Sequence, residues 1–235
     1  AIDGGTVLVA AQQMPNGGPG AAYIFRTSDG GASYDQVAKL MASDGALDDR
    51  FSAFLAIEGG TVVIGAPRDD DAGTNSGSAY VFRTNDGWAT YNFVAKLTAD
   101  DAAAGDYFGK EVGIEDGVVA IGALAPPGIE PSGGEAVYIF HASDDGLTYS
   151  QVAKLTAADG VAGDRFGQSL AMDGGTIVVG AMRDEDAGNR TGSVYVFSLS
   201  AAPTPQPTAV ALGSDSATRA GPLLALLLVA ATTVL

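Results

Sequence analysis

The feature that most constrains the fold of this chain is an internal repeat. A phrase of Tyr, an aliphatic residue and Phe recurs at steps of 57, 58 and 57 residues, beginning at Tyr23, Tyr80, Tyr138 and Tyr195. A second phrase, Val-Ala-Lys-Leu, keeps the same step and begins at Val37, Val94 and Val152. Unrelated phrases that share one period indicate an array of supersecondary units, each stacked on the next.

Each unit reads as short extended runs separated by turns. In the last copy, such runs lie at 166–172, 176–181 and 193–197, and in earlier copies a fourth follows, as at 149–155. Asp-Gly pairs before the fourth run are hairpin signals. Short connections make neighbouring strands antiparallel, so each unit is predicted to be a four-stranded meander. The first copy is expected to lack its first strand, and the last copy its fourth.

The second strand of each unit is apolar on consecutive residues, as at Val62-Val63-Ile64 and Ile177-Val178-Val179. A strand with one face in water alternates instead, so both faces must be covered, and the adjacent copies are the available covers. Glycine in the first strand, at Gly109 and Gly167, suits a crowded axis where a side chain would prevent close approach.

The sequence therefore predicts an all-β fold, a β-propeller of about four four-stranded antiparallel blades of 57–58 residues, in a partial, open arc. A β-sandwich is the alternative, but it does not explain the regular period. The apolar end faces of an open arc are expected to self-associate. The blades are expected at residues 1–48, 49–105, 106–163 and 164–200.

Composition narrows the function classes. The net charge of −16 disfavours nucleic acid and anionic membrane surfaces as partners. The chain has no cysteine and one histidine, His141, at a repeat position that elsewhere holds Arg or Ser, so it is expected to be exposed. Without a second histidine or a Gly-x-Ser-x-Gly turn there is no visible machinery for nucleophilic catalysis, and we expect no enzyme activity.

The loop after the second strand is acidic in two copies. Alternate carboxylates at Asp69 and Asp71, and at Asp184 and Asp186, are candidate ligands for a cation such as Ca²⁺, and no other cofactor is expected. The alternative is an Asx-turn with a local Arg pair, since the spacing does not follow the EF-hand rule. A further acidic set recurs before the first strand and is expected to accept backbone N–H bonds, at Asp44, Asp49, Asp101, Asp106, Asp159 and Asp164.

From residue 201 the repeat stops. Residues 201–221 form a stalk rich in Pro, Ala and Ser, and residues 222–235 form a hydrophobic segment. Small residues near Ser214, a polar spacer and an apolar tail resemble a glycolipid-anchor signal, with a short transmembrane helix as the alternative. Asn189 begins an N-glycosylation triplet. We therefore expect a protein anchored at the cell surface through its C-terminus.

Three phrases in order resemble the FG-GAP repeat, the unit of the integrin α-subunit propeller and of bacterial and algal surface proteins. They are Phe108-Gly109 or Phe166-Gly167, then Gly65-Ala66-Pro67, then the Tyr-x-Phe strand. The first copy departs from the pattern, with Ala10-Ala11-Gln12 in place of Gly-Ala-Pro, and the second copy has Phe51-Ser52.

The resemblance also implies a calcium loop between the first and second strands. Here that connection is a tight turn with too few oxygens for Ca²⁺, at Glu58-Gly59-Gly60, Glu115-Asp116-Gly117 and Asp173-Gly174-Gly175.

The resemblance and the tail together favour a cell-surface or secreted, non-catalytic scaffold that binds an extracellular protein or glycan through its loops, with adhesion as the role. One alternative is an accessory module of an ectoenzyme, a hydrolase whose catalytic domain lies upstream of residue 1. Another is a structural wall component without a discrete ligand.

Overall fold

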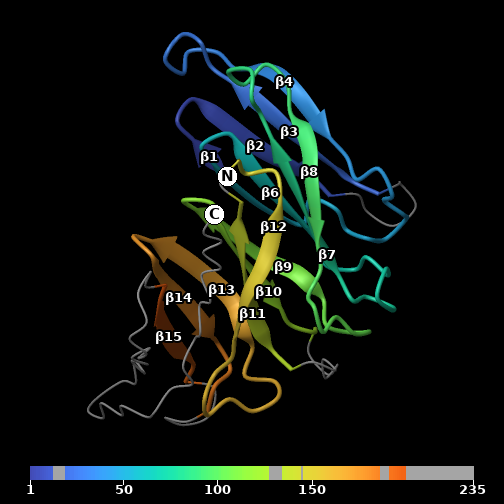
Figure 1. Cartoon of the computed structure of the whole chain (residues 1–235), viewed down its shortest axis with the longest axis vertical. Helices are drawn as coiled ribbons and strands as arrows, with labels where there is room; N and C mark the ends of the chain where they lie inside the picture. Colours follow the sequence, from blue (N-terminus) through green and yellow to red (C-terminus); the bar gives the residue numbers. More distant parts are fainter. Residues whose placement is uncertain (13–18, 127–133, 144, 186–190, 200–235) are drawn as a thin grey trace, which may run out of the picture.

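The structure, a computed structural model, describes residues 1–12, 19–126, 134–143, 145–185 and 191–199. These residues form fifteen strands in four antiparallel sheets and contain no helix. Figure 1 shows the sheets following one another along a curved row, with the first sheet at one end and the fourth at the other. The described part of the chain is an open β-propeller, and we number its sheets as blades 1 to 4.

Within each blade the strands pair in chain order. Blade 1 contains β1 (Ile2–Asp3), β2 (Thr6–Ala11), β3 (Ala21–Arg26) and β4 (Asp35–Leu40). Blade 2 contains β5 (Phe54–Glu58), β6 (Thr61–Ala66), β7 (Ser78–Arg83) and β8 (Asn92–Leu97). Blade 3 contains β9 (Phe108–Glu115), β10 (Val118–Ala123), β11 (Ala136–Ala142) and β12 (Tyr149–Leu155). Blade 4 contains β13 (Phe166–Asp173), β14 (Thr176–Ala181) and β15 (Ser193–Ser198).

One detail of the prediction is wrong. Blade 1 does have a first strand, because Ile2 and Asp3 of β1 pair with Val7 and Thr6 of β2. Two residues after the chain start are too short a run to show periodicity, so the sequence pattern missed this strand. In blade 4, β15 is the last strand among the described residues, and a fourth strand would lie after them, so its expected absence stays a prediction.

The hydrophobic core lies between the blades, as the consecutive apolar residues predicted. On β6, Val62 and Ile64 pack in a cluster shared with blade 1, while Val63 packs in a cluster shared with blade 3. On β10, Ile121 faces blade 2, and Ala120 belongs to a third cluster shared with blade 4. Because each central sheet is covered on both faces, the two middle blades depend on both of their neighbours.

In blades 2 to 4, a buried phenylalanine at or just before the inner strand packs on the Tyr-x-Phe phrase of its own blade. The ring of Phe108 lies 5.5 Å from that of Tyr138 and 6.0 Å from that of Phe140, centroid to centroid. Phe51 and Phe166 make the same pair of contacts in blades 2 and 4. Five of these six ring pairs are edge-to-face and the pair of Phe108 and Tyr138 is tilted. Such contacts add to the energy of burial, which explains why this phenylalanine and the Tyr-x-Phe phrase recur together.

Glycines allow the backbones of adjacent blades to touch near the axis, as expected for Gly109 and Gly167. A Cβ atom on Gly65 would lie 2.0 Å from the carbonyl oxygen of Gly109, and one on Gly122 would lie 2.8 Å from that of Gly167. Gly109 also has φ of +90°, a conformation that side chains disfavour. The Phe-Gly phrase of one blade therefore meets the Gly-Ala phrase of the preceding blade.

The tight turns after the inner strands connect successive blades. In each case a carboxylate from one turn accepts a hydrogen bond from a backbone amide in the turn of the next blade. The three bonds, of 2.7–2.8 Å, run from the amides of Gly59, Asp116 and Gly174 to the carboxylates of Asp3, Glu58 and Glu115, respectively. We call this series the turn clasp. It occupies the position where the resemblance to integrin blades implies a calcium loop.

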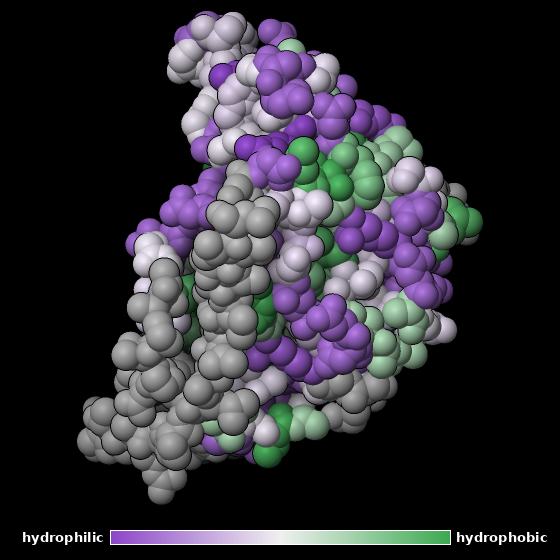
Figure 2. All heavy atoms as spheres, viewed as in Figure 1, coloured by the Kyte–Doolittle hydropathy of each residue, from purple (hydrophilic) through white to green (hydrophobic). Residues whose placement is uncertain are grey.

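Figure 2 shows hydrophilic residues spread over the visible face, with smaller hydrophobic patches between them. At one end of the arc, Ile2 and Val9 of blade 1 are exposed, and Met182 of blade 4 is exposed as well. These side chains belong to the end faces through which self-association was predicted, and that expectation stays a prediction.

Candidate functional site

The acidic loops gather at one end of the blades. Because the strands are antiparallel, the start of each inner strand, the end of the second strand and the end of the fourth strand lie at the same end. We call this end the loop face. It includes the segment between β4 and β5, which leads from blade 1 to blade 2, and the loop between β6 and β7.

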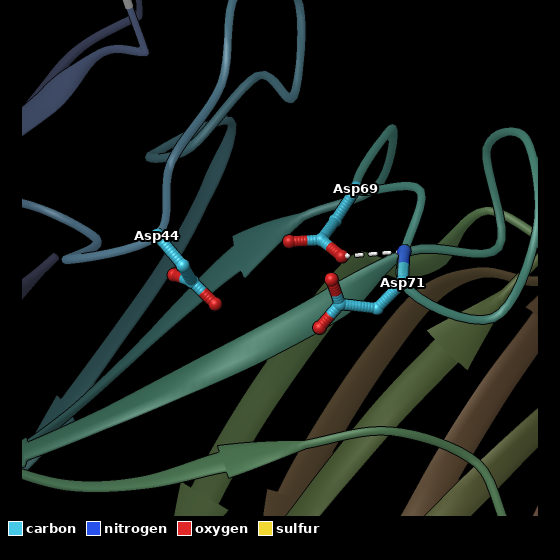
Figure 3. A group of neighbouring side chains, drawn as sticks. All are labelled: Asp44, Asp69 and Asp71. Atoms are coloured by element: carbon cyan, nitrogen blue, oxygen red, sulfur yellow. Dashed lines mark hydrogen bonds between the residues drawn. The ribbon is translucent and has the colours of Figure 1, made fainter.

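Three carboxylates converge on this face in blade 2 (Figure 3). One oxygen from each of Asp44, Asp69 and Asp71 lies within 4.8 Å of the others. The ammonium group of Lys96, near the end of β8, forms ion pairs with all three, at 2.7 Å to Asp44 and 2.9 Å to Asp69. The cation at the centre of this cluster is therefore a lysine from the repeated Val-Ala-Lys-Leu phrase.

The hydroxyl of the buried Tyr80 completes the cluster from the protein interior. It hydrogen-bonds to Asp44 at 3.0 Å and to Asp69 at 2.9 Å, and burial, together with Asp69, raises its pKa far above the ordinary value. Burial alone would raise the pKa of Asp44, but hydrogen bonds from Lys96 and Tyr80 outweigh it, so this pKa is lowered. These contacts stabilise the ionised carboxylates and hold two separate loops together.

Blades 3 and 4 repeat parts of this arrangement. In blade 3, Lys154 pairs with Asp101 at 2.7 Å, and the Tyr138 hydroxyl donates to the same carboxylate. In blade 4 the Tyr195 hydroxyl lies 2.9 Å from Asp159 and 2.8 Å from Asp184. No lysine of a fourth strand is described there, since β15 ends the described part of the blade.

The predicted metal ligands are therefore placed only in part. Asp69 and Asp71 lie together, joined by Asp44, and the Asp71 amide donates to the Asp69 carboxylate at 3.2 Å, as the Asx-turn alternative expected. The local Arg pair of that alternative is not found among the described residues, where Lys96 forms the ion pairs instead. A Ca²⁺ ion at this point would have to displace the lysine, and cation binding stays a prediction.

Asp184 is buried against Tyr195, whereas three other predicted sites lie outside the described residues: Asp186, the glycosylation candidate Asn189 and the lipid-anchor candidate Ser214. The stalk and tail, residues 201–235, lie outside them too.

The second acidic set divides into two kinds. As predicted, three of its members accept a backbone N–H from three residues upstream, at 2.6–2.8 Å, namely Asp49, Asp106 and Asp164. The other three bind the tyrosine hydroxyl of the next blade, and this role was missed: Asp44, Asp101 and Asp159. Their partners are the Tyr and Lys residues of the repeated phrases, which lie 36 residues or more from these aspartates in sequence.

His141 is exposed at the end of β11, as expected, and among the described residues it lies apart from the acidic cluster of blade 2. Among the residues that the structure describes, there is no helix long and apolar enough to cross a membrane.

The profile of the FG-GAP repeat family matches residues 34–82, 91–140 and 149–197. Each match begins just before or within the outer strand of one blade and ends in the third strand of the next. A search of curated proteins gave no match. Among solved structures, Saccharomyces cerevisiae Sqt1 is similar at 12% identity with a TM-score of 0.44, over 81% of this chain and 42% of the other. The chain thus spans less than half of the length of that protein.

Proposed function

Because the chain belongs to the FG-GAP repeat family, we propose that it is a non-catalytic binding scaffold of the cell surface or extracellular space, with adhesion as its role. Its ligand is an extracellular protein or glycan, bound by the loop face. The family supports this reading, since FG-GAP propellers are often found in surface and adhesion proteins.

The observation that carries the proposal is the ion-pair cluster around Lys96. It ties together two loops that are separate in sequence, yet the side chains of Asp44 and Asp71 remain 46% and 58% exposed. Loops held in one conformation bind with a smaller loss of entropy than mobile loops do. The cluster therefore presents fixed carboxylates to a ligand while Asp69 and Tyr80 hold them from below.

A binding array of purified glycans and extracellular-matrix proteins, probed with the whole chain, tests the proposal. We expect at least one ligand whose binding weakens in Asp71→Asn and Asp48→Asn, both on the loop face. Asp35→Asn is the matched control, because this exposed carboxylate begins β4 at the opposite end of the blade. No ligand in the array, or equal weakening by the control, contradicts the proposal.

The absence of catalysis is tested with the same preparation. We expect no turnover of fluorogenic glycoside, ester or phosphate substrates. Turnover that copurifies with the chain and is lost in Asp71→Asn would show that the protein is an enzyme and would contradict the non-catalytic proposal.

We further propose display at the cell surface through residues 201–235, supported by the proline-rich stalk and the uncharged run from Leu223 to Leu235. A phosphatidylinositol-specific phospholipase is expected to release the protein from cells if a glycolipid anchor is attached near Ser214. Retention on the membrane after this treatment supports the transmembrane alternative, and recovery of the untreated protein in the medium contradicts both.

A further inference from the structure

A second charged cluster on the loop face has the opposite sign. A cleft of about 130 Å³ opens near the axis, where blades 2 and 3 meet. Its described lining includes three cations, Arg50, Arg68 and Lys110, together with Tyr107 and Gln12. None of the described lining residues is Asp or Glu, although the chain carries 28 acidic residues against 12 basic ones. Three basic side chains at one cleft are therefore a marked local exception.

Three separate segments bring these cations together. Arg50 precedes β5, Arg68 follows β6, and Lys110 lies on β9 of the next blade. The backbone amide of Arg68 donates to the carbonyl oxygen of Asp49 at 3.2 Å, which places the two arginine-bearing loops side by side. The same bond recurs in blade 4, from the Arg183 amide to the Asp164 carbonyl oxygen at 2.9 Å. The arginine pair is thus a product of the repeat, not of one irregular loop.

The positive charge in the cleft is not neutralised within the described residues. Every ion pair found there involves Lys96 or Lys154, so no carboxylate pairs with Arg50, Arg68 or Lys110. Burial lowers the pKa of Lys110, and nearby arginines lower it further. The ammonium group of Lys110 lies 5.7 Å from the centre of the Tyr107 ring, and this contact stabilises the charge less than an anion would. Like charges gathered in a partly buried cleft repel one another unless an anion binds between them.

A fourth cation near the cleft has partners of its own. Arg165 donates to the side chain of Gln168 at 2.9 Å, and Glu135 lies close enough to favour its charged form. We therefore restrict the site to Arg50, Arg68 and Lys110.

We propose that this cleft binds one small oxyanion group, a sulfate or a carboxylate, carried by the ligand of the loop face. The proposal rests on the proposed function and names the chemistry of its ligand. Guanidinium groups bind two oxygens of such an anion at once, and the ammonium group adds a point charge. The acidic cluster of Asp44, Asp69 and Asp71 on the same face disfavours a long polyanion, so the ligand carries an isolated negative group on an otherwise neutral body.

Calorimetric titration of the whole chain with sodium sulfate and with sodium glucuronate, at constant ionic strength, tests the site. We expect binding of at least one of them at about 10 mM or below, weakened tenfold or more in the double variant Arg68→Gln/Lys110→Gln. Lys39→Gln is the matched control, because it removes an exposed lysine of β4 in blade 1 and is expected to bind like the wild type.

A second readout separates anion binding from a structural role. Removing mutually repelling cations is expected to raise the melting temperature of Lys110→Gln above that of the wild type without anion, and sulfate is expected to reverse this order. Tighter binding of sulfate indicates a sulfate ester on the ligand, and tighter binding of glucuronate indicates a carboxylate. No binding of either anion, or equal binding by the double variant, overturns the proposal.

The two proposals fail separately. A ligand from the array that binds the double variant as well as the wild type removes the oxyanion site and leaves the scaffold. If the chain binds sulfate or glucuronate but no ligand in the array, the oxyanion site remains and the scaffold proposal is removed.

Discussion

Two boundaries between blades hold different residues at equivalent positions. Between blades 2 and 3, Gly65 and Gly109 bring the backbones into direct contact. Between blades 1 and 2, the positions are held by Ala10 and Ser52, and Ala10 is exposed. Ser52 keeps the left-handed backbone that glycine favours, with φ of +72°, and its buried hydroxyl has no hydrogen-bond partner among the described residues.

The difference teaches that the two glycines of the repeat are halves of one contact across blades. At the boundary where both are replaced, Asp44 from the segment after blade 1 still contacts Lys96 and Tyr80 of blade 2 on the loop face. The glycine contact and the ion-pair cluster are then two means of joining successive blades, and each can be changed separately.

The largest effect is expected from closing the tight boundary with a methyl group. In Gly109→Ala the new Cβ would lie 2.4 Å from the Ser78 carbonyl oxygen, at a left-handed backbone. We expect unfolding free energy to fall by about 3–5 kcal/mol, from the clash and the backbone cost together, measured by chemical denaturation. Gly30→Ala is the control, because φ there is +76° with no heavy atom within 4 Å. Equal losses in both variants would show that the backbone angle alone matters.

Next in size is removal of the lysine that joins blade 1 to blade 2. Lys96→Met leaves three carboxylates together, including the buried Asp69, and should cost about 2–3 kcal/mol at neutral pH. The loss should shrink as pH falls, since a protonated carboxyl relieves the repulsion. Lys39→Met changes the equivalent lysine of blade 1, which forms no ion pair among the described residues, and should be nearly neutral. A pH-independent loss would argue against the electrostatic account.

A smaller effect concerns the boundary of blades 3 and 4. Glu111 pairs with Gly122 in the sheet, and burial raises its pKa to about 7 from an ordinary 4.5. Between these values the folded state holds a proton that the unfolded state has lost, so stability falls as pH rises, and the penalty is complete above pH 7. Glu111→Gln should therefore gain about 1–2 kcal/mol at pH 8 and nothing below pH 4.5.

The measurement is the free energy of unfolding by urea as a function of pH, for the wild type and for Glu111→Gln. A variant whose stability follows the wild-type curve across this range contradicts a raised pKa at Glu111.

The smallest effect should stabilise the protein. Ser52→Gly restores the glycine of the repeat, relieves the left-handed backbone and removes a buried hydroxyl that finds no partner in the described part of the chain. We expect a gain of about 1 kcal/mol, seen as a higher midpoint of denaturation. A destabilised variant would indicate that Ser52 contributes a contact that glycine cannot replace.

The architecture could be predicted from the sequence because its determinants repeat. Val62-Val63-Ile64 required a sheet covered on both faces, and the phrase period required that the covers be copies of the same unit. The strand β1 was missed, since Ile2 and Asp3 are too few to show alternation. Its pairing is fixed by β2, a tertiary context that local pattern does not report.

The charged sites were predictable only where their members are neighbours in sequence. Asp69 and Asp71 stand two residues apart and were found, whereas Lys96 reaches them across 25 residues or more. The cationic cleft was missed altogether, because Arg50 and Arg68 recur with the repeat but no pattern in the sequence joins Lys110 to them. Only the stacking of blade 3 on blade 2 brings them to one place.

The turn clasp gives the row of blades a direction. Every inner turn carries a carboxylate that can accept from the next blade and a backbone amide that can donate to the preceding blade. At the ends of the described row, the acceptor position of blade 4 is Asp173 and the donor position of blade 1 is Gly4. A unit duplicated within the row would arrive with both halves of the joint already encoded. Duplication of a unit would thus lengthen such a protein, and deletion of a unit would shorten it, while every remaining joint keeps the same donor and acceptor positions.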